Sequence, residues 1–143
     1  MSHTNLIDHD EYNRWYDQAK YTVCSAQNDL EKNDFVWASF KFQQAGEYAG
    51  KALLRALGLP ARGHSILMLL KELAEQGLEI TEEVKSAARE LDRHYIPPRY
   101  PDAFPSGSPY EFYDQKTAYS AFQAANTLID FVQALKEGLE RDA

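Results

Sequence analysis

The sequence predicts an all-α protein, an up-and-down bundle of about five helices with a proline-rich loop before the last helix. Helix-forming Ala and Leu occur 18 and 15 times, whereas the β-branched residues Val and Ile together occur 9 times. No alternation of apolar and polar residues is long enough to indicate a strand, and apolar residues instead recur every three or four positions. At 143 residues the chain is expected to form one domain spanning 1–143, with its core at about 10–140.

The first helix is expected over 10–32, with the side chain of Asp8 as its N-terminal cap. The second is expected over 35–57, after the cap residue Asp34. This second helix has two apolar stripes, and the second stripe consists of Val36, Phe40, Gln43, Glu47 and Leu54. A helix with two apolar sides is expected to lie at the centre of a bundle or to be covered by a second subunit.

The third helix is expected over 65–76, the fourth from the cap residue Thr81, and the fifth from the cap residue Asp114 to about residue 140. Short links that contain Gly join the second helix to the third and the third to the fourth, which predicts that each of these two pairs packs antiparallel. Five of the six prolines and five aromatic residues fall within 96–113. This loop cannot be helical, and its aromatic content indicates a functional segment packed over the bundle surface.

The composition argues against several classes of protein. The net charge of −7 does not suit a protein that coats nucleic acid or an anionic membrane. The charge is uneven, because residues 35–101 carry +1 while each flanking part carries −4, so a local phosphate site fits the middle of the chain. The single cysteine, the lack of a signal peptide and the lack of a long apolar segment predict a cytoplasmic protein without membrane association.

The segment 43–52 places Glu47 and Lys51 four residues apart on the second helix. Such a pair is commonly a surface ion pair. Glu47 shares its stripe with apolar residues, however, so it also fits a buried network, within the chain or across a dimer, or a ligand site. His64 precedes the third helix and is predicted to cap it, with a ligand contact as the alternative.

The segment 91–103 runs from the fourth helix into the proline-rich loop. Arg99 lies among rigid residues, which suits recognition of a phosphate or carboxylate group, and Tyr95 or Tyr100 would stack on a base. The alternative is that Arg99 binds Asp92 or Asp102 and fixes the loop to the bundle.

A catalytic pair is also present in the sequence. Arg89 and His94, with four residues between them, would bind phosphate and act as general acid and base in RNA cleavage. On one continuous helix they lie 140° apart, so they converge only if the helix breaks or a second subunit completes the site. The sequence has no metal-binding, phosphate-loop or dinucleotide motif, and no metal or cofactor is expected.

Three motifs together resemble the HEPN domain (higher eukaryotes and prokaryotes nucleotide-binding) over roughly residues 12–135. They are Gln43-Gln44-Ala45-x-Glu47-x-x-x-Lys51-Ala52, then His64, then Leu91-Asp92-x-x-Tyr95-Ile96-Pro97-x-Arg99-Tyr100-Pro101-Asp102. The resemblance implies a bundle of about five helices, commonly a homodimer, that is often encoded beside a minimal nucleotidyltransferase and sometimes belongs to a toxin–antitoxin pair. Some HEPN proteins are metal-independent ribonucleases that use an arginine and a histidine four to six residues apart. In this sequence no histidine follows Arg99 before Pro105.

The sequence therefore predicts a nucleotide- or RNA-binding module that works with a minimal nucleotidyltransferase. Its site is predicted to comprise Glu47, Lys51, His64, Asp92, Arg99, Tyr100 and Asp102. Arg99 and Lys51 would hold phosphate and Tyr100 would stack, while the three carboxylates would orient those cations or a ribose. The alternatives are a ribonuclease toxin that uses Arg89 and His94 across a dimer, and an interaction domain whose second stripe is only a dimer interface.

Overall fold

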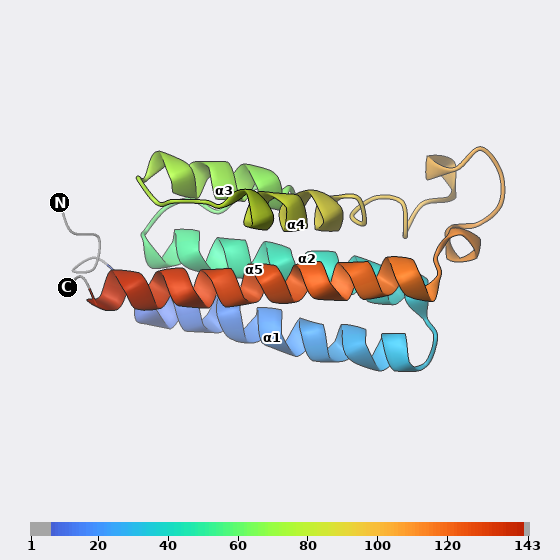
Figure 1. The fold of residues 1–143 in the computed structure, drawn as a ribbon, viewed down its shortest axis with the longest axis horizontal. Coiled ribbons are helices and arrows are strands. Elements are labelled where there is room, and N and C mark those ends of the chain that lie inside the picture. Colours follow the sequence, from blue (N-terminus) through green and yellow to red (C-terminus); the bar gives the residue numbers. More distant parts are fainter. Residues whose placement is uncertain (1–6, 142–143) are drawn as a thin grey trace.

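The computed structural model describes residues 7–141 and contains no strand within them. Five α-helices and two short 3₁₀ helices make up the fold, which confirms the predicted all-α class. Their bounds are α1 His9–Glu31, α2 Phe35–Ala56, α3 Ile66–Glu75, α4 Glu82–Asp92, η2 Pro101–Ala103, η3 Pro109–Phe112 and α5 Gln115–Arg141. In Figure 1 the three long helices α1, α2 and α5 run along the molecule, with α3 and α4 on one side of them.

The helix starts follow the predicted caps, with one exception. Asp8, Asp34 and Thr81 each accept a hydrogen bond from the backbone N–H three residues later, at the starts of α1, α2 and α4. The Asp114 carboxylate accepts one from the N–H of Thr117 at the start of α5. The prediction that His64 caps the third helix is wrong, because Ser65 is the N-cap and its hydroxyl accepts from the N–H of Met68.

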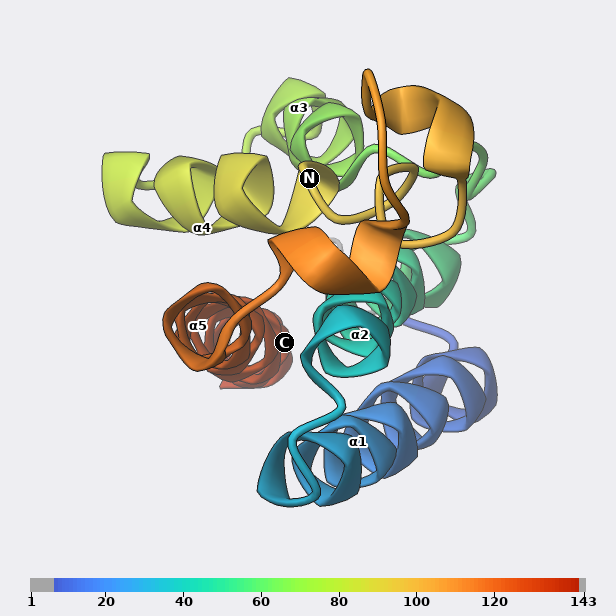
Figure 2. The same cartoon turned by 90° about the vertical axis from the view of Figure 1, so that its right-hand side faces the viewer.

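Helix α2 is the central helix of the bundle, as its two apolar stripes predicted. It contacts α1, α3, α4 and α5, and Figure 2 shows it end-on between α1 and the layer that holds α3. Its second stripe is covered by the same chain. Val36, Gln43, Glu47 and Leu54 are buried, and the Phe40 ring packs against Tyr95 and Arg99. This stripe is therefore not an open surface for a second subunit.

Helix α3 runs parallel to α2, so the predicted antiparallel packing of this pair is wrong. Gly46 faces Ile66 and, one turn further along both helices, Gly50 faces Leu69. The link of residues 57–65 is long enough to return along α2 before α3 begins, and the Gln43 side chain binds the His64 carbonyl near its end. Helices α3 and α4 are antiparallel as predicted, because the last residue of α4 bonds the first residue of α3.

A glycine permits the close approach of three helices. A Cβ on Gly46 would lie 2.7 Å from Leu91 Cδ1 and 2.8 Å from Ile66 Cδ1, which is closer than packed carbon atoms come. Both of these neighbours are fully buried. The bare backbone at Gly46 therefore sets how near α3 and α4 lie to the polar residues of α2.

The proline-rich segment contains no α-helix, as predicted, but it has internal order. Its two 3₁₀ helices are separated by a turn across which the Phe104 and Phe112 rings stack, with centroids 4.3 Å apart. Helix η3 contacts α2, while Figure 1 shows the rest of the segment extending past the end of the long helices. Within residues 7–141, no helix combines the length and apolar character that crossing a membrane requires.

Candidate functional site

The Glu47 carboxylate is the centre of a buried polar network on α2. The residue is 6% exposed, and its Oε2 lies 2.9 Å from Lys51 Nζ and 3.3 Å from His64 Nδ1. Its Oε1 is 3.4 Å from the amide nitrogens of both Gln43 and Gln44. A buried carboxylate requires such partners, so this cluster is a network within one chain rather than a surface ion pair.

The same network holds the link between α2 and α3 in place. The Gln43 amide is fully buried and donates to the carbonyl oxygen of His64 at 3.0 Å, while its oxygen accepts from Gln44 at 2.8 Å. The His64 side chain is 57% exposed, so it presents its ring to solvent beside the buried carboxylate. The predicted ligand contact at His64 is consistent with this position.

Arg99 lies in an aromatic cage built from two distant parts of the chain. Its guanidinium carbon lies 4.3 Å from the ring centroid of Tyr95 and 4.8 Å from those of Phe40 and Tyr100. Its Nε donates to the Tyr95 carbonyl at 2.8 Å. These contacts hold the guanidinium plane in one orientation, which is the preorganisation that recognition of an oxyanion requires.

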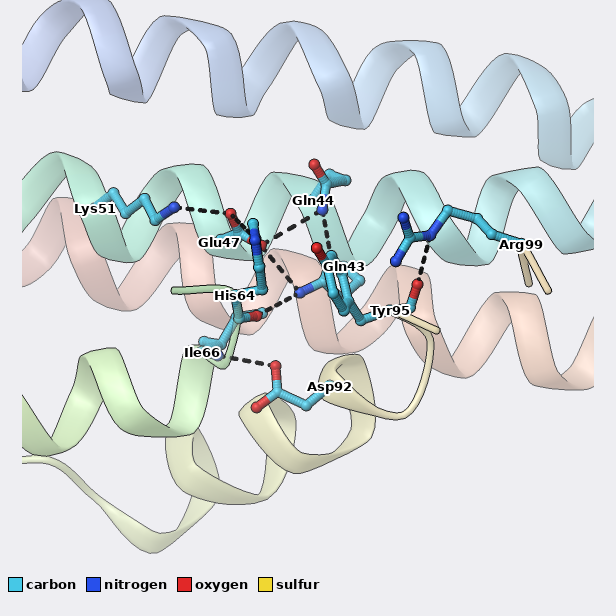
Figure 3. Close-up of polar contacts among 9 residues, drawn as sticks. All are labelled: Gln43, Gln44, Glu47, Lys51, His64, Ile66, Asp92, Tyr95 and Arg99. Carbon is cyan, nitrogen blue, oxygen red and sulfur yellow. Dashed lines mark hydrogen bonds and ion pairs between the residues drawn. The ribbon is translucent and has the colours of Figure 1, made fainter. Parts of the chain in front are cut away.

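The Arg99 cage and the Glu47 network are joined into one row. The His64 ring stacks on the Tyr95 ring, with centroids 4.6 Å apart and planes 16° from parallel. Figure 3 shows Lys51, Glu47, His64, Tyr95 and Arg99 following one another along α2. Lys51 and Arg99 therefore lie at the two ends of a continuous set of contacts.

Asp92 has a structural role at the start of α3. Its two carboxylate oxygens accept from the backbone N–H groups of Ile66 at 2.8 Å and Leu67 at 3.1 Å, and from the Ser65 hydroxyl at 3.0 Å. It therefore supplies acceptors for N–H groups that no residue within α3 can satisfy. Asp92 positions the chain next to His64 and does not orient Arg99.

The alternative prediction, that Arg99 binds Asp92 or Asp102, is wrong. Within the described residues Arg99 forms no ion pair with Asp92 or Asp102. Asp102 is exposed in η2. The charge of Arg99 is therefore free for a ligand, while Lys51 shares its charge with Glu47 and is 11% exposed in its side chain.

The structure does not bring Arg89 and His94 together as a catalytic pair. Helix α4 ends at Asp92, and His94 turns inward to 5% exposure. Its two ring nitrogens lie 3.0 Å from the Tyr113 hydroxyl and 3.2 Å from Glu90 Oε2, whereas Arg89 is at the surface, 3.7 Å from Glu82. Burial lowers the pKa of His94, and the bond to Glu90 opposes this shift. His94 thus ties α4 to the segment before α5.

The sequence alone did not indicate two of the residues that build the site. Phe40 was assigned to the second stripe of α2, yet its ring faces Arg99. Gln44 was part of the first motif but was given no role in the site. The only available signal was that Phe40, Gln44 and Glu47 recur at helical spacing on one side of α2.

Comparison with known proteins decides the family. The family model for the HEPN domain matches residues 12–136. This chain belongs to the HEPN family. Membership supports a nucleotide- or RNA-related module at the level of the family, and no curated protein matches the chain significantly.

Solved structures agree with this assignment. TT1696 from Thermus thermophilus is 40% identical with a TM-score of 0.83, and the match covers 87% of this chain and 97% of that one. ST0689, described as an archaeal HEPN homologue, is 30% identical with a TM-score of 0.75 and the same coverage. A HEPN domain protein from Thermotoga maritima, TM0613, is 37% identical with a TM-score of 0.70, covering 85% and 96% of the two chains.

Proposed function

We propose that this HEPN protein binds a nucleotide, or the phosphate and base of an RNA, along the row from Lys51 to Arg99 and on the Tyr100 ring beside it. The observation that carries the proposal is Arg99, a cation in an aromatic cage without a carboxylate partner in the described chain. Arginine held in this way retains N–H donors that match the oxygens of a phosphate group.

The other residues of the row have distinct roles in this proposal. Tyr100 is 49% exposed and offers a ring on which a base stacks. Tyr95 already contacts His64 and Arg99, so it supports the cage instead of stacking on the ligand. Lys51 adds positive charge at the far end, and the exposed His64 ring supplies a hydrogen-bonding group between the two cations.

Titration of ATP by calorimetry tests the proposal. Wild-type protein is expected to bind in the millimolar range or tighter, and Arg99→Ala is expected to weaken binding at least about tenfold. Arg93→Ala is the matched control, because that guanidinium is exposed and pairs with Glu90 on the neighbouring helix turn. Absence of millimolar binding by the wild type, or equal affinity of all three proteins, would rule the site out.

The family resemblance supports two finer proposals about partners. The protein forms a homodimer, and it works with a minimal nucleotidyltransferase, in some settings as a toxin–antitoxin pair. Light scattering at micromolar concentration measures the first, and co-purification with a nucleotidyltransferase encoded next to this gene measures the second. A monomeric state would contradict the first proposal, and the absence of a co-purifying nucleotidyltransferase would contradict the second.

A further inference from the structure

One cavity of the described structure lies away from this row. It has a volume of about 500 Å³ and is found where α1 begins and α2 ends, at the end of the bundle opposite the proline-rich segment (Figure 1). The apolar link 58–61 forms part of its wall, and its charged lining residues are Asp8, Glu11, Arg55 and Arg62. This volume falls in the range of small-molecule sites.

Arg55 lines this cavity, and no acceptor within the described residues bonds its side chain. Its guanidinium carbon lies 5.5 Å from the ring centroid of Trp15, so cation–π contact fixes the side chain against α1. Its Nε is buried and has no hydrogen-bond partner among residues 7–141. A buried donor left unsatisfied is costly, and no acceptor in the described part of the chain offsets this cost.

The carboxylates of the cavity already have partners. Asp8 Oδ1 accepts from the backbone N–H of Glu11 at 3.0 Å as the cap of α1, and Glu11 Oε2 pairs with Arg14 at 3.1 Å. In the described part of the chain neither Arg55 nor Arg62 forms an ion pair. Within the described residues the cavity therefore contains two arginines without an ion-pair partner, next to two carboxylates that already accept hydrogen bonds.

We propose that this cavity binds a phosphate group between Arg55 and Arg62. Two guanidinium groups match the charge of a phosphate dianion, and each presents parallel N–H donors to its oxygens. The room left beside a phosphate would accept the remainder of a phosphorylated molecule. The proposal uses none of the groups that bind ligand in the Arg99 row, so it stands or falls separately from the function proposed above.

Trp15 provides the readout, since the chain has two tryptophans and Trp37→Phe leaves Trp15 as the reporter. Inorganic phosphate is titrated at about pH 7.5, where it is mostly dianionic, against acetate and chloride at matched ionic strength. A saturable change in Trp15 emission is expected with phosphate only. AMP is a further arm that distinguishes a nucleotide phosphate from the free ion.

Variants in the same background assign the response. Arg62 is exposed, so Arg62→Gln should fold normally and raise the phosphate midpoint about fivefold or more, while Arg55→Gln should abolish the response. Arg93→Gln and Arg99→Ala should leave it unchanged. A response that acetate reproduces would overturn the assignment to phosphate. No saturable response, or one that survives in Arg62→Gln and Arg55→Gln alike, would overturn the site itself.

Discussion

Replacing Asp92 by Asn tests whether a residue at the end of α4 holds the start of α3. The substitution keeps the shape of the side chain but removes the charge and one of two acceptor oxygens. In the wild type one oxygen accepts from Ile66 and the other from Leu67 and the Ser65 hydroxyl. Whichever way the amide turns, at least one backbone N–H of α3 faces another donor.

The size of the effect follows from these bonds. A hydrogen bond to a charged group contributes about 1.5–3 kcal/mol, and the negative charge at a helix N-terminus adds about 0.3–1 kcal/mol. The free energy of unfolding should therefore fall by about 2–4 kcal/mol. With a urea m-value of about 2 kcal/mol/M, the unfolding midpoint should drop by about 1–2 M.

Urea unfolding followed by far-ultraviolet circular dichroism measures this change. Asp102→Asn is the matched control, because that carboxylate is exposed in η2 and its loss should cost less than about 0.5 kcal/mol. The reasoning is refuted if the two variants unfold at the same urea concentration. Asp92→Asn should also bind ATP more weakly than the wild type. The reason is that Asp92 accepts a hydrogen bond from Ser65, which holds the neighbouring His64 in the proposed site.

Further predictions concern packing and pH. Gly46→Ala should lower the free energy of unfolding by about 1–2 kcal/mol, because overpacking against buried Leu91 outweighs the gain of about 1 kcal/mol in helix propensity. Gly50→Ala should leave the free energy of unfolding nearly unchanged, because its Cβ would lie 3.3 Å from Leu69 Cδ1. Equal urea midpoints for Gly46→Ala and Gly50→Ala would contradict this packing argument. Burial lowers the pKa of His94, so the His94 imidazole binds a proton more readily in the unfolded chain than in the folded protein. The folded state should therefore lose stability as the pH falls below about 6.5. His94→Gln should flatten the decline in urea midpoint between about pH 7 and 5, and an unchanged slope would refute this assignment.

The helices were predictable because local signals define them. Each of the predicted caps at Asp8, Asp34, Thr81 and Asp114 bonds the expected backbone N–H, and the proline-rich segment interrupts the helices as expected. The direction of α3 was not predictable from the length of its link. Nine residues suffice either for a turn into an antiparallel helix or for a return along α2, and packing at Gly46 and Gly50 selects the second.

The site was predictable only where its residues share one helix. Glu47 and Lys51 pair at helical spacing, as the sequence indicated. The hydrogen bonds that define the roles of Asp92 and His64 join residues 17–27 positions apart in the sequence, which no local pattern encodes. Tertiary contact likewise decides the surroundings of Arg99, because Phe40 reaches it from the beginning of α2.

The row from Lys51 to Arg99 has a thermodynamic consequence, because it exists only when three separate stretches of chain come together. Any molecule bound across α2, the α2–α3 link and the segment after α4 binds the native state and not the unfolded chain. At a ligand concentration of about 100 times Kd, such binding adds about 2.7 kcal/mol to the free energy of unfolding. Melting temperatures measured against a panel of nucleotides and oligoribonucleotides would therefore rank ligands for this protein without an activity assay.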